Sequence, residues 1–352
     1  DRHRESARMT LGVTHPATPR HLRSIVAVLC LTVLLNGSLV VSVAAYVDEE
    51  PAVRLMAVGD LMLGWEVGRR IARKGVAAPW ARVDQFLDQA DLVVGNLECV
   101  ISVRGEPWPS KLIHLRAPLK TAQSLGAGGV DVVSVANNHA LDFGAVGLAD
   151  TLSALDAAHI AHAGGGSNSA AARAPALLDR NGLRVAFLGY VLPFSSRTTF
   201  NTREWEAGAN TAGLAIGTPQ AVAADVAAAR RLADVVVVMV HGGVEYKSRP
   251  VAAQRAFADA AINAGASLVL GHHPHVLQGY MRRGKTLVAF SLGNFVFSRF
   301  TGASNDSAIL DVTLTPSGVS DFRWIPVVIE AGIPRPAVGA EIDRIRRRLP
   351  AL

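Results

Sequence analysis

Short apolar runs alternate with stretches of helical periodicity along most of the chain. The apolar runs predict buried strands at Arg54–Gly59, Leu92–Gly95, Val130–Ala136, Val235–Val240 and Leu268–Leu270. The Ala-rich stretches between them predict helices over residues 65–74, 82–89, 144–157, 217–232 and 251–264. Strands separated by helices favour parallel pairing, so the pattern predicts a layered α/β fold.

Three later segments have the pattern of hairpins instead. They cover residues 176–191, 276–297 and 308–329, with turns at Asn181-Gly182, Arg283-Gly284 and Ser317-Gly318. Segment 195–213 has a loop-like sequence, and its length predicts a lid or a substrate loop. We therefore expect an α/β sandwich with mixed sheets over residues 52–330. A basic tail, 331–352, follows it; within this tail, 340–349 predicts a short amphipathic helix that is a solvated face or a membrane-surface contact.

An uncharged apolar run, Ser24–Tyr46, follows a basic N-terminal extension at residues 1–23. A basic flank, an apolar stretch and then small residues (Ser42, Ala44 and Ala45) form the pattern of a secretory signal. The run is also long enough to span a bilayer, which takes roughly 20 residues. We therefore expect export, with residues 24–46 as either a signal peptide or a transmembrane anchor.

Composition and charge narrow the class of protein. Half of the residues are hydrophobic and 18% are charged, which excludes an intrinsically disordered chain. The net charge of +6 divides between residues 1–24 and 333–352, each with five Arg against two acidic residues. The body between them is neutral, so we expect no nucleic-acid partner. Cys30 and Cys99 are the only cysteines, so any metal must be held by His, carboxylate or Asn.

Polar residues follow five of the predicted strands, at the ends that open onto the ligand crevice of a parallel sheet. They are Asp60; Asn96 and Glu98; Asn138, His139 and Asp142; His241, Glu245 and Tyr246; and His273 and His275. Each alone has an ordinary explanation as a cap, a turn or a hydrogen-bonded residue. Together, oxygen and imidazole groups without thiolate predict a site for Zn, Mn or Fe. An extended segment would point His273 and His275 in the same direction.

The motifs that carry these residues resemble a known family. They are Gly59–Gly64 (GDLMLG), Gly95–Glu98 (GNLE), Ala136–His139 (ANNH) with Asp142 and Gly144, His241–Tyr246 (HGGVEY), His273–Val276 (HPHV) with Gln278, and Ser291–Phe297 (SLGNFVF). In this order they resemble the CapA family, the poly-γ-glutamate capsule synthesis proteins. The fold of that family is similar to the calcineurin-like metallophosphoesterases.

The resemblance implies roles for individual residues. It implies that the metal ligands are Asp60, Glu98, Asn138, His241, His273 and His275. It places His139 where the phosphoesterases have the histidine beside the leaving group. Two positions depart from the phosphoesterase pattern, because Met62 replaces a His and Asn96 replaces a bridging Asp. A neutral Asn bridges two cations poorly, so we expect one tightly bound divalent metal, or two of uneven affinity.

Several residues near the ligands have two interpretations. His139 is the expected proton donor, and Asp142 either orients it or is a helix-start residue that complements the helix dipole. We expect Asn96, Glu245, Tyr246 and Asn294 to contact the substrate. Alternatively, Glu245 pairs with Arg249 and Asn294 only forms a turn.

Two classes of function remain open from the sequence. In the first, the protein is an extracytoplasmic, metal-dependent hydrolase or transferase of the bacterial cell envelope. Its substrate would be an anionic envelope polymer or a phosphoester, and it would cleave or transfer at a phosphoester or an amide. In the second, it is a non-catalytic, metal-containing component that binds such a polymer and works with polymer synthase or export partners.

Overall fold

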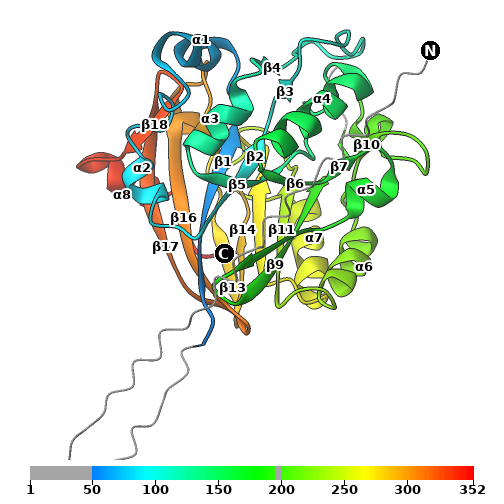
Figure 1. The fold of residues 1–352 in the computed structure, drawn as a ribbon. Coiled ribbons are helices and arrows are strands. Elements are labelled where there is room, and N and C mark those ends of the chain that lie inside the picture. Colours follow the sequence, from blue (N-terminus) through cyan, green and yellow to red (C-terminus); the bar gives the residue numbers. More distant parts are fainter. Residues whose placement is uncertain (1–49, 195–199) are drawn as a thin grey trace, which may run out of the picture. The chain divides into compact units, whose positions relative to one another are not determined.

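Two mixed β-sheets pack face to face in the computed structural model, which describes residues 50–194 and 200–352 (Figure 1). The first sheet has the order β18 (Ile333–Pro336), β17 (Gly318–Glu330), β16 (Asp306–Thr315), β1 (Val53–Leu61), β2 (Leu92–Leu97), β5 (Val130–Ser134) and β6 (Ala161–Ala163), with β15 (Asn294–Val296) beside the end of β1. The second has the order β13 (Tyr280–Arg283), β14 (Thr286–Ala289), β12 (Leu268–His272), β11 (Val235–His241), β9 (Leu183–Val191) and β8 (Ala176–Arg180).

Helices cover the outer face of each sheet, which gives four layers. On the first sheet lie α1 (Trp65–Lys74), α2 (Asp84–Leu87), α3 (Thr121–Ala127) and α4 (Gly144–Ala157), and on the second lie α6 (Pro219–Ala229) and α7 (Ala252–Asn263). The remaining elements are α5 (Ser169–Arg173), α8 (Ala340–Arg346), two short 3₁₀ turns (Thr202–Trp205 and Gly302–Asn305) and two small strand pairs, β3 (Val100–Ile101) with β4 (Arg116–Ala117) and β7 (Gly165–Gly166) with β10 (Gly213–Leu214). The predicted α/β sandwich with mixed sheets is confirmed.

Successive side chains of a strand point to opposite faces of its sheet, so each sheet can pack against the other sheet on one face and against helices on the other. In β1, Leu55 and Ala57 point into the core between the sheets, whereas Met56 and Val58 point toward the helices. Both faces of this strand are therefore buried, which is why its sequence is an apolar run without polar alternation. Full burial of a Leu or Met side chain stabilises the fold by about 1.5–3 kcal/mol.

The predicted pairing directions are confirmed. Strands β1, β2, β5 and β6 are parallel neighbours, as are β9, β11, β12 and β14. The three predicted hairpins supply the antiparallel pairs β8–β9, β13–β14 and β16–β17.

The last 22 residues belong to this sandwich rather than forming a separate tail. Strand β18 pairs with β17, and the predicted helix is present as α8. Ile345 and Leu349 of this segment are buried, while Arg344 and Arg348 bind the carboxylate of Asp306. The boundary expected at residue 330 is therefore wrong, because the apolar face of the helix packs on the sheet.

The expected signal or anchor, residues 24–46, and the extension before it lie outside the described residues, as do residues 195–199 of the expected loop. Within residues 50–194 and 200–352, the structure contains no helix with the length and hydrophobicity of a membrane-spanning segment.

Candidate functional site

Polar side chains from both sheets converge at the carboxyl ends of their parallel strands. The first sheet supplies Asp60 near the end of β1, Glu98 after β2, and Asn138 in the turns after β5. The second sheet supplies His241 at the end of β11, and His273 and His275 after β12. The structure thus brings the six predicted ligands to the same edge of the sandwich.

The His241 ring lies at the junction between the two groups of residues. Its Nε2 atom is 2.8 Å from Asn138 Oδ1 and 3.1 Å from His273 Nδ1. Asn138 therefore points toward the histidines, while Nδ1 of the neighbouring His139 contacts a different partner, Asp142. Three potential ligand atoms, His241 Nε2, Asn138 Oδ1 and His273 Nδ1, therefore lie close together.

Asp60 and Glu98 form the acidic half of the site, and both side chains are fully buried. Asp60 Oδ1 lies 3.3 Å from His272 Nδ1, and Asp60 Oδ2 lies 3.5 Å from His275 Nδ1. Glu98 Oε1 is 3.8 Å from His241 Nε2 and 3.9 Å from His275 Nε2. These last separations exceed hydrogen-bond length, so Glu98 faces the two imidazoles across a gap.

Several buried polar atoms of the site have no hydrogen-bond partner among the described residues. They are Asp60 Oδ2, both carboxylate oxygens of Glu98 and both ring nitrogens of His272. Buried polar atoms are normally paired, and an unpaired carboxylate is costly. Single ligand atoms of Asp60, Glu98 and His241 also lie within 4.8 Å of one another. This donor set, with oxygen and imidazole but no thiolate, fits a divalent cation such as Zn, Mn or Fe.

Burial and neighbouring charges shift the protonation of these groups in opposite directions. Burial raises the pKa of Glu98 well above its usual value, and the charge of Asp60 raises it further. Burial also acts to raise the pKa of Asp60, but the imidazoles of His272 and His275 outweigh it and lower that pKa. At His275, burial is outweighed by Glu98 and Asp60, which raise the pKa to about 9. Burial, followed by the nearby His275, lowers the pKa of His273 to about 3. The two carboxylates oppose each other's ionisation, a conflict that a cation relieves.

Asn96 and Asn294 form hydrogen bonds to predicted metal ligands. Both are fully buried. The Asn96 amide donates to Asp60 Oδ1 at 2.8 Å and lies 3.1 Å from His241 Nδ1, while Asn294 Oδ1 is 2.9 Å from His275 Nδ1. Both asparagines therefore fix the positions of ligand side chains, and their predicted contact with the substrate stays a prediction.

A close approach of two backbones places Asn294 opposite Asp60. The Asp60 amide donates to Gly293 O at 2.9 Å, and Asp60 and Asn294 are partners in the β1–β15 register. A Cβ atom at Gly59 would lie only 2.1 Å from Gly293 O. The glycine before the aspartate is therefore needed so that β1 and the segment before β15 can meet.

His139 lies beside the ligands, in a buried hydrogen-bond network. Its Nδ1 is 2.7 Å from Asp142 Oδ2, which is the contact expected from the sequence. The intervening residues form turns, and α4 begins only at Gly144. Because an ionised carboxylate only accepts, Nδ1 carries the proton and Nε2 remains for a reactant. Burial lowers the pKa of His139 to about 4, so this ring is neutral near pH 7.

Lys111 completes this network. Its ammonium group donates to Asp142 Oδ1 and to the backbone carbonyl of Asn138. It also lies 4.8 Å from the Trp205 ring centre. The side chain is 7% exposed, and burial lowers the pKa of the lysine. Asp142 also accepts from Leu115 N at 2.6 Å, so three donors fix its carboxylate.

The histidine segment after β12 is a turn, contrary to the extended segment that we expected. His273 and His275 have φ values of +97° and +55°, and the nearby Tyr246 has φ +63°. Left-handed backbone at such residues costs about 1–3 kcal/mol each and concentrates at functional sites. The two rings nevertheless come together, with centroids 6.0 Å apart, because the turn and not the alternation of a strand directs them.

Glu245 and Tyr246 lie at the exposed rim of the site. A carboxylate oxygen of Glu245 and ring nitrogens of His273 and His275 lie within 4.8 Å of one another, which makes a second group of candidate ligand atoms. Tyr246 is 59% exposed, with its ring 6.3 Å from the His275 ring. The alternative pairing of Glu245 with Arg249 does not occur in the described part of the chain.

Two residues of the site were not predicted from the sequence. His272 stands directly before His273, and its proximity to the other histidines was the available signal. Lys111 lies in segment 102–120, which has no helical or strand periodicity, so nothing in the sequence connected it to Asp142.

Comparisons with known proteins agree on one group of relatives. Residues 54–299, which contain all the predicted ligands, match the family described as "Bacterial capsule synthesis protein PGA_cap". The chain is 32% identical over 309 residues to the capsule biosynthesis protein CapA of Bacillus anthracis, covering 86% of this chain and 74% of that protein. It is 31% identical over 281 residues to the PGA biosynthesis protein CapA of Bacillus subtilis, covering 79% and 72%. A Mycobacterium tuberculosis protein named "Probable polyglutamine synthesis accessory protein" is 32% identical over 222 residues, covering 60% and 57%.

Proposed function

The chain belongs to the PGA_cap family of bacterial capsule synthesis proteins, and we propose that it is a metal-dependent hydrolase or transferase acting on an envelope polymer. One observation carries this proposal: a buried cluster of carboxylates and imidazoles with unpartnered atoms lies beside a histidine that a carboxylate orients. Such a combination is characteristic of a catalytic site rather than of a structural core.

The residues that would hold the cation are Asp60, Glu98, Asn138, His241, His273 and His275. A divalent cation bound there would supply Lewis acidity, which polarises an acyl or phosphoryl oxygen. Asn96 and Asn294 keep the ligands in place by bonding Asp60 and His275. The identity of the cation is part of the proposal, with Mn, Zn or Fe as the candidates.

His139 is the proposed proton-transfer residue. Its Nδ1 donates to Asp142, so the ring is held in one tautomer with Nε2 available. Nε2 has no hydrogen-bond partner in residues 50–194 and 200–352. We assign Nε2 to proton transfer with the substrate: it accepts a proton from the attacking water or hydroxyl and returns it to the departing oxygen or nitrogen, and positioned acid–base catalysis of this kind accelerates cleavage by about 10²–10⁴.

The proposed substrate is an anionic polymer such as poly-γ-glutamate, cleaved or transferred at an amide or phosphoester bond. Its support is indirect, because two relatives are named for capsule and PGA biosynthesis. We also propose that the protein works outside the cytoplasm, because residues 24–46 form an uncharged apolar run after a basic flank.

Replacing His139 by Ala tests the catalytic proposal. We expect metal content near that of the parent and hydrolysis of a generic phosphodiester or a γ-linked glutamate amide reduced by about 10²–10⁴. Asp142→Asn should cause a smaller loss, because it disturbs orientation and leaves the imidazole in place. His162→Ala is the matched control, since His162 pairs with Asp156 at 3.1 Å outside this cluster. Equal rates in parent and His139→Ala would contradict the assignment.

A second function is favoured by the departures from the phosphoesterase pattern. Met62 and Asn96 stand where those enzymes have a His and a bridging Asp, and one relative is named an accessory protein. In this case the site would bind the polymer without cleaving it. A parent protein with bound metal, native folding and no hydrolysis of any tested ester or amide would favour this second function.

A further inference from the structure

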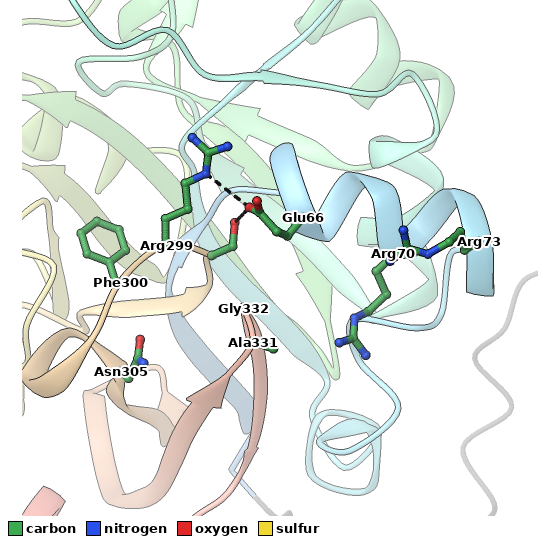
Figure 2. A pocket seen from close by; sticks show the side chains of 9 residues that line it. Glu66, Arg70, Arg73, Arg299, Phe300, Asn305, Ala331 and Gly332 are labelled. Atoms are coloured by element: carbon green, nitrogen blue, oxygen red, sulfur yellow. Dashed lines mark hydrogen bonds and ion pairs between the residues drawn. The ribbon is translucent and has the colours of Figure 1, made fainter.

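A hollow of about 290 Å³ lies between α1 and the turn that joins β17 to β18 (Figure 2). Three guanidinium groups line it, those of Arg70 and Arg73 on α1 and of Arg299 after β15. Glu66 is the single carboxylate among its lining residues. The hollow therefore has an excess of positive charge.

Glu66 neutralises only part of this excess, because its carboxylate is shared between Arg69 and Arg299. Oε1 pairs with Arg69 at 2.7 Å, while Oε2 accepts from Ser298 Oγ at 2.8 Å and lies 3.4 Å from Arg299 Nε. Arg70 and Arg73 form no ion pair in the described part of the chain. Figure 2 shows both side chains on the opposite side of Glu66 from Arg299. Two guanidinium groups thus remain for an anionic ligand.

The hollow adjoins the candidate metal site. Phe300, which lines it, has its ring 4.8 Å from the His275 ring and 6.4 Å from the Tyr246 ring. Arg299 is held in place by stacking 4.2 Å over the Trp65 ring. One aromatic ring therefore separates the arginine-lined hollow from a predicted ligand.

Two further hollows extend the basic surface away from the site. One, of about 490 Å³, shares Arg70 with the first and adds Lys74 and Arg82. The next shares Arg82 and adds Arg335. Of these cations, Arg82 pairs with Glu330 and Arg335 with Glu341, whereas Lys74 has no such partner among the described residues. Six cationic side chains line the three hollows against two carboxylates.

We propose that these three hollows bind a carboxylate-rich polymer along its length and lead it to the metal site. The substrate class rests on the proposed function, whereas the binding surface rests on the arginines themselves. A guanidinium group matches a carboxylate with two parallel hydrogen bonds. Exposed ion pairs contribute little singly, so the surface suits a ligand that makes several contacts at once.

Binding of γ-linked glutamate oligomers to the purified full-length chain tests this inference. Fluorescence anisotropy at low salt is measured for the parent, for Arg70→Ala/Arg73→Ala, and for Arg230→Ala/Arg231→Ala. The last variant removes the same charge at the end of α6, on the outer face of the second sheet. We expect the first variant to bind long oligomers about tenfold more weakly, the control to match the parent, and the difference to shrink at high salt.

The outcomes separate this inference from the proposed function. His273→Ala/His275→Ala should abolish activity yet keep oligomer binding, because the arginines remain. If no variant hydrolyses anything but the Arg70/Arg73 effect persists, the binding surface stands and the enzyme proposal falls. Equal affinity in the parent and Arg70→Ala/Arg73→Ala would overturn the inference, as would equal weakening in both double variants. If Arg70→Ala/Arg73→Ala instead lost binding to phosphatidylglycerol vesicles and kept its affinity for the oligomer, the surface would be assigned to a lipid. That result would also overturn the inference.

Discussion

Replacing Lys111 by Met tests whether the buried network behind His139 stabilises the site. Methionine has a similar length and can keep the apolar packing beside Trp205, but it has no donor. The variant therefore removes the bonds to Asp142 and to the Asn138 carbonyl without removing the side-chain bulk. Asp142, which is fully buried, keeps only Leu115 N and His139 Nδ1 as donors.

The magnitude follows from the burial of the pair. Breaking a buried ion pair by removing one partner costs about 3–5 kcal/mol, because the other charge is left uncompensated. The cost here is lower, since Asp142 keeps two donors and the desolvation of the ammonium group is relieved. We expect the free energy of unfolding to fall by about 2–3 kcal/mol, in line with about 1.5–3 kcal/mol for one charge-assisted hydrogen bond.

The change should also alter the dependence of stability on pH. Burial acts to raise the pKa of Asp142, but His139 and Lys111 outweigh it and lower that pKa. A carboxylate with a lowered folded-state pKa stabilises the protein above its unfolded pKa, and this contribution disappears as the pH falls. Without Lys111 the folded-state pKa rises, so the stability that remains should be lost at a higher pH than in the parent.

Chemical unfolding followed by tryptophan fluorescence measures both effects, with Trp205 as a reporter near Lys111. Lys74→Met is the matched control, because Lys74 is exposed and should change stability by less than about 0.5 kcal/mol. A Lys111→Met variant as stable as this control, with an unchanged pH profile, would refute a stabilising role for the network.

Two further predictions concern the metal and the location of the protein. His273→Ala/His275→Ala should remove most of the bound Mn or Zn while the circular dichroism spectrum stays native, and equal metal content in variant and parent would refute the ligand assignment. Cell fractionation should recover the protein in the membrane or outside the cytoplasm because of residues 24–46, and a full-length cytosolic protein would rule out export.

Local patterns were sufficient to predict much of the fold. The helices expected at 65–74 and 144–157 coincide with α1 and α4, because glycines flank α1 at both ends and Gly144 marks the start of α4. The Asn181-Gly182 turn was equally informative, since both residues have positive φ values between β8 and β9. Helix α3 was missed, because its short Ala- and Gly-containing stretch lacks a clear apolar stripe.

The site was only partly predictable, because its geometry depends on contacts between distant segments. The strand-end residues were found, since parallel strands present their carboxyl ends together. The contact between Lys111 and Asp142 joins a segment without periodicity to a turn, and no local pattern encodes such a pair. The left-handed backbone of His273 and His275 was also unpredictable, because tertiary contacts impose a conformation that these residues otherwise avoid.

The candidate ligands are divided between the two sheets, with the acidic residues on one and the histidines on the other. A cation bound by the acidic residues and the histidines together would link the two sheets. Separating the sheets would then also require release of the ion. Folding and metal supply would then be linked, and a cation present at 100 times its dissociation constant would add about 2.7 kcal/mol to stability. The survival of this chain against heat and proteases would therefore follow the metal content of its surroundings.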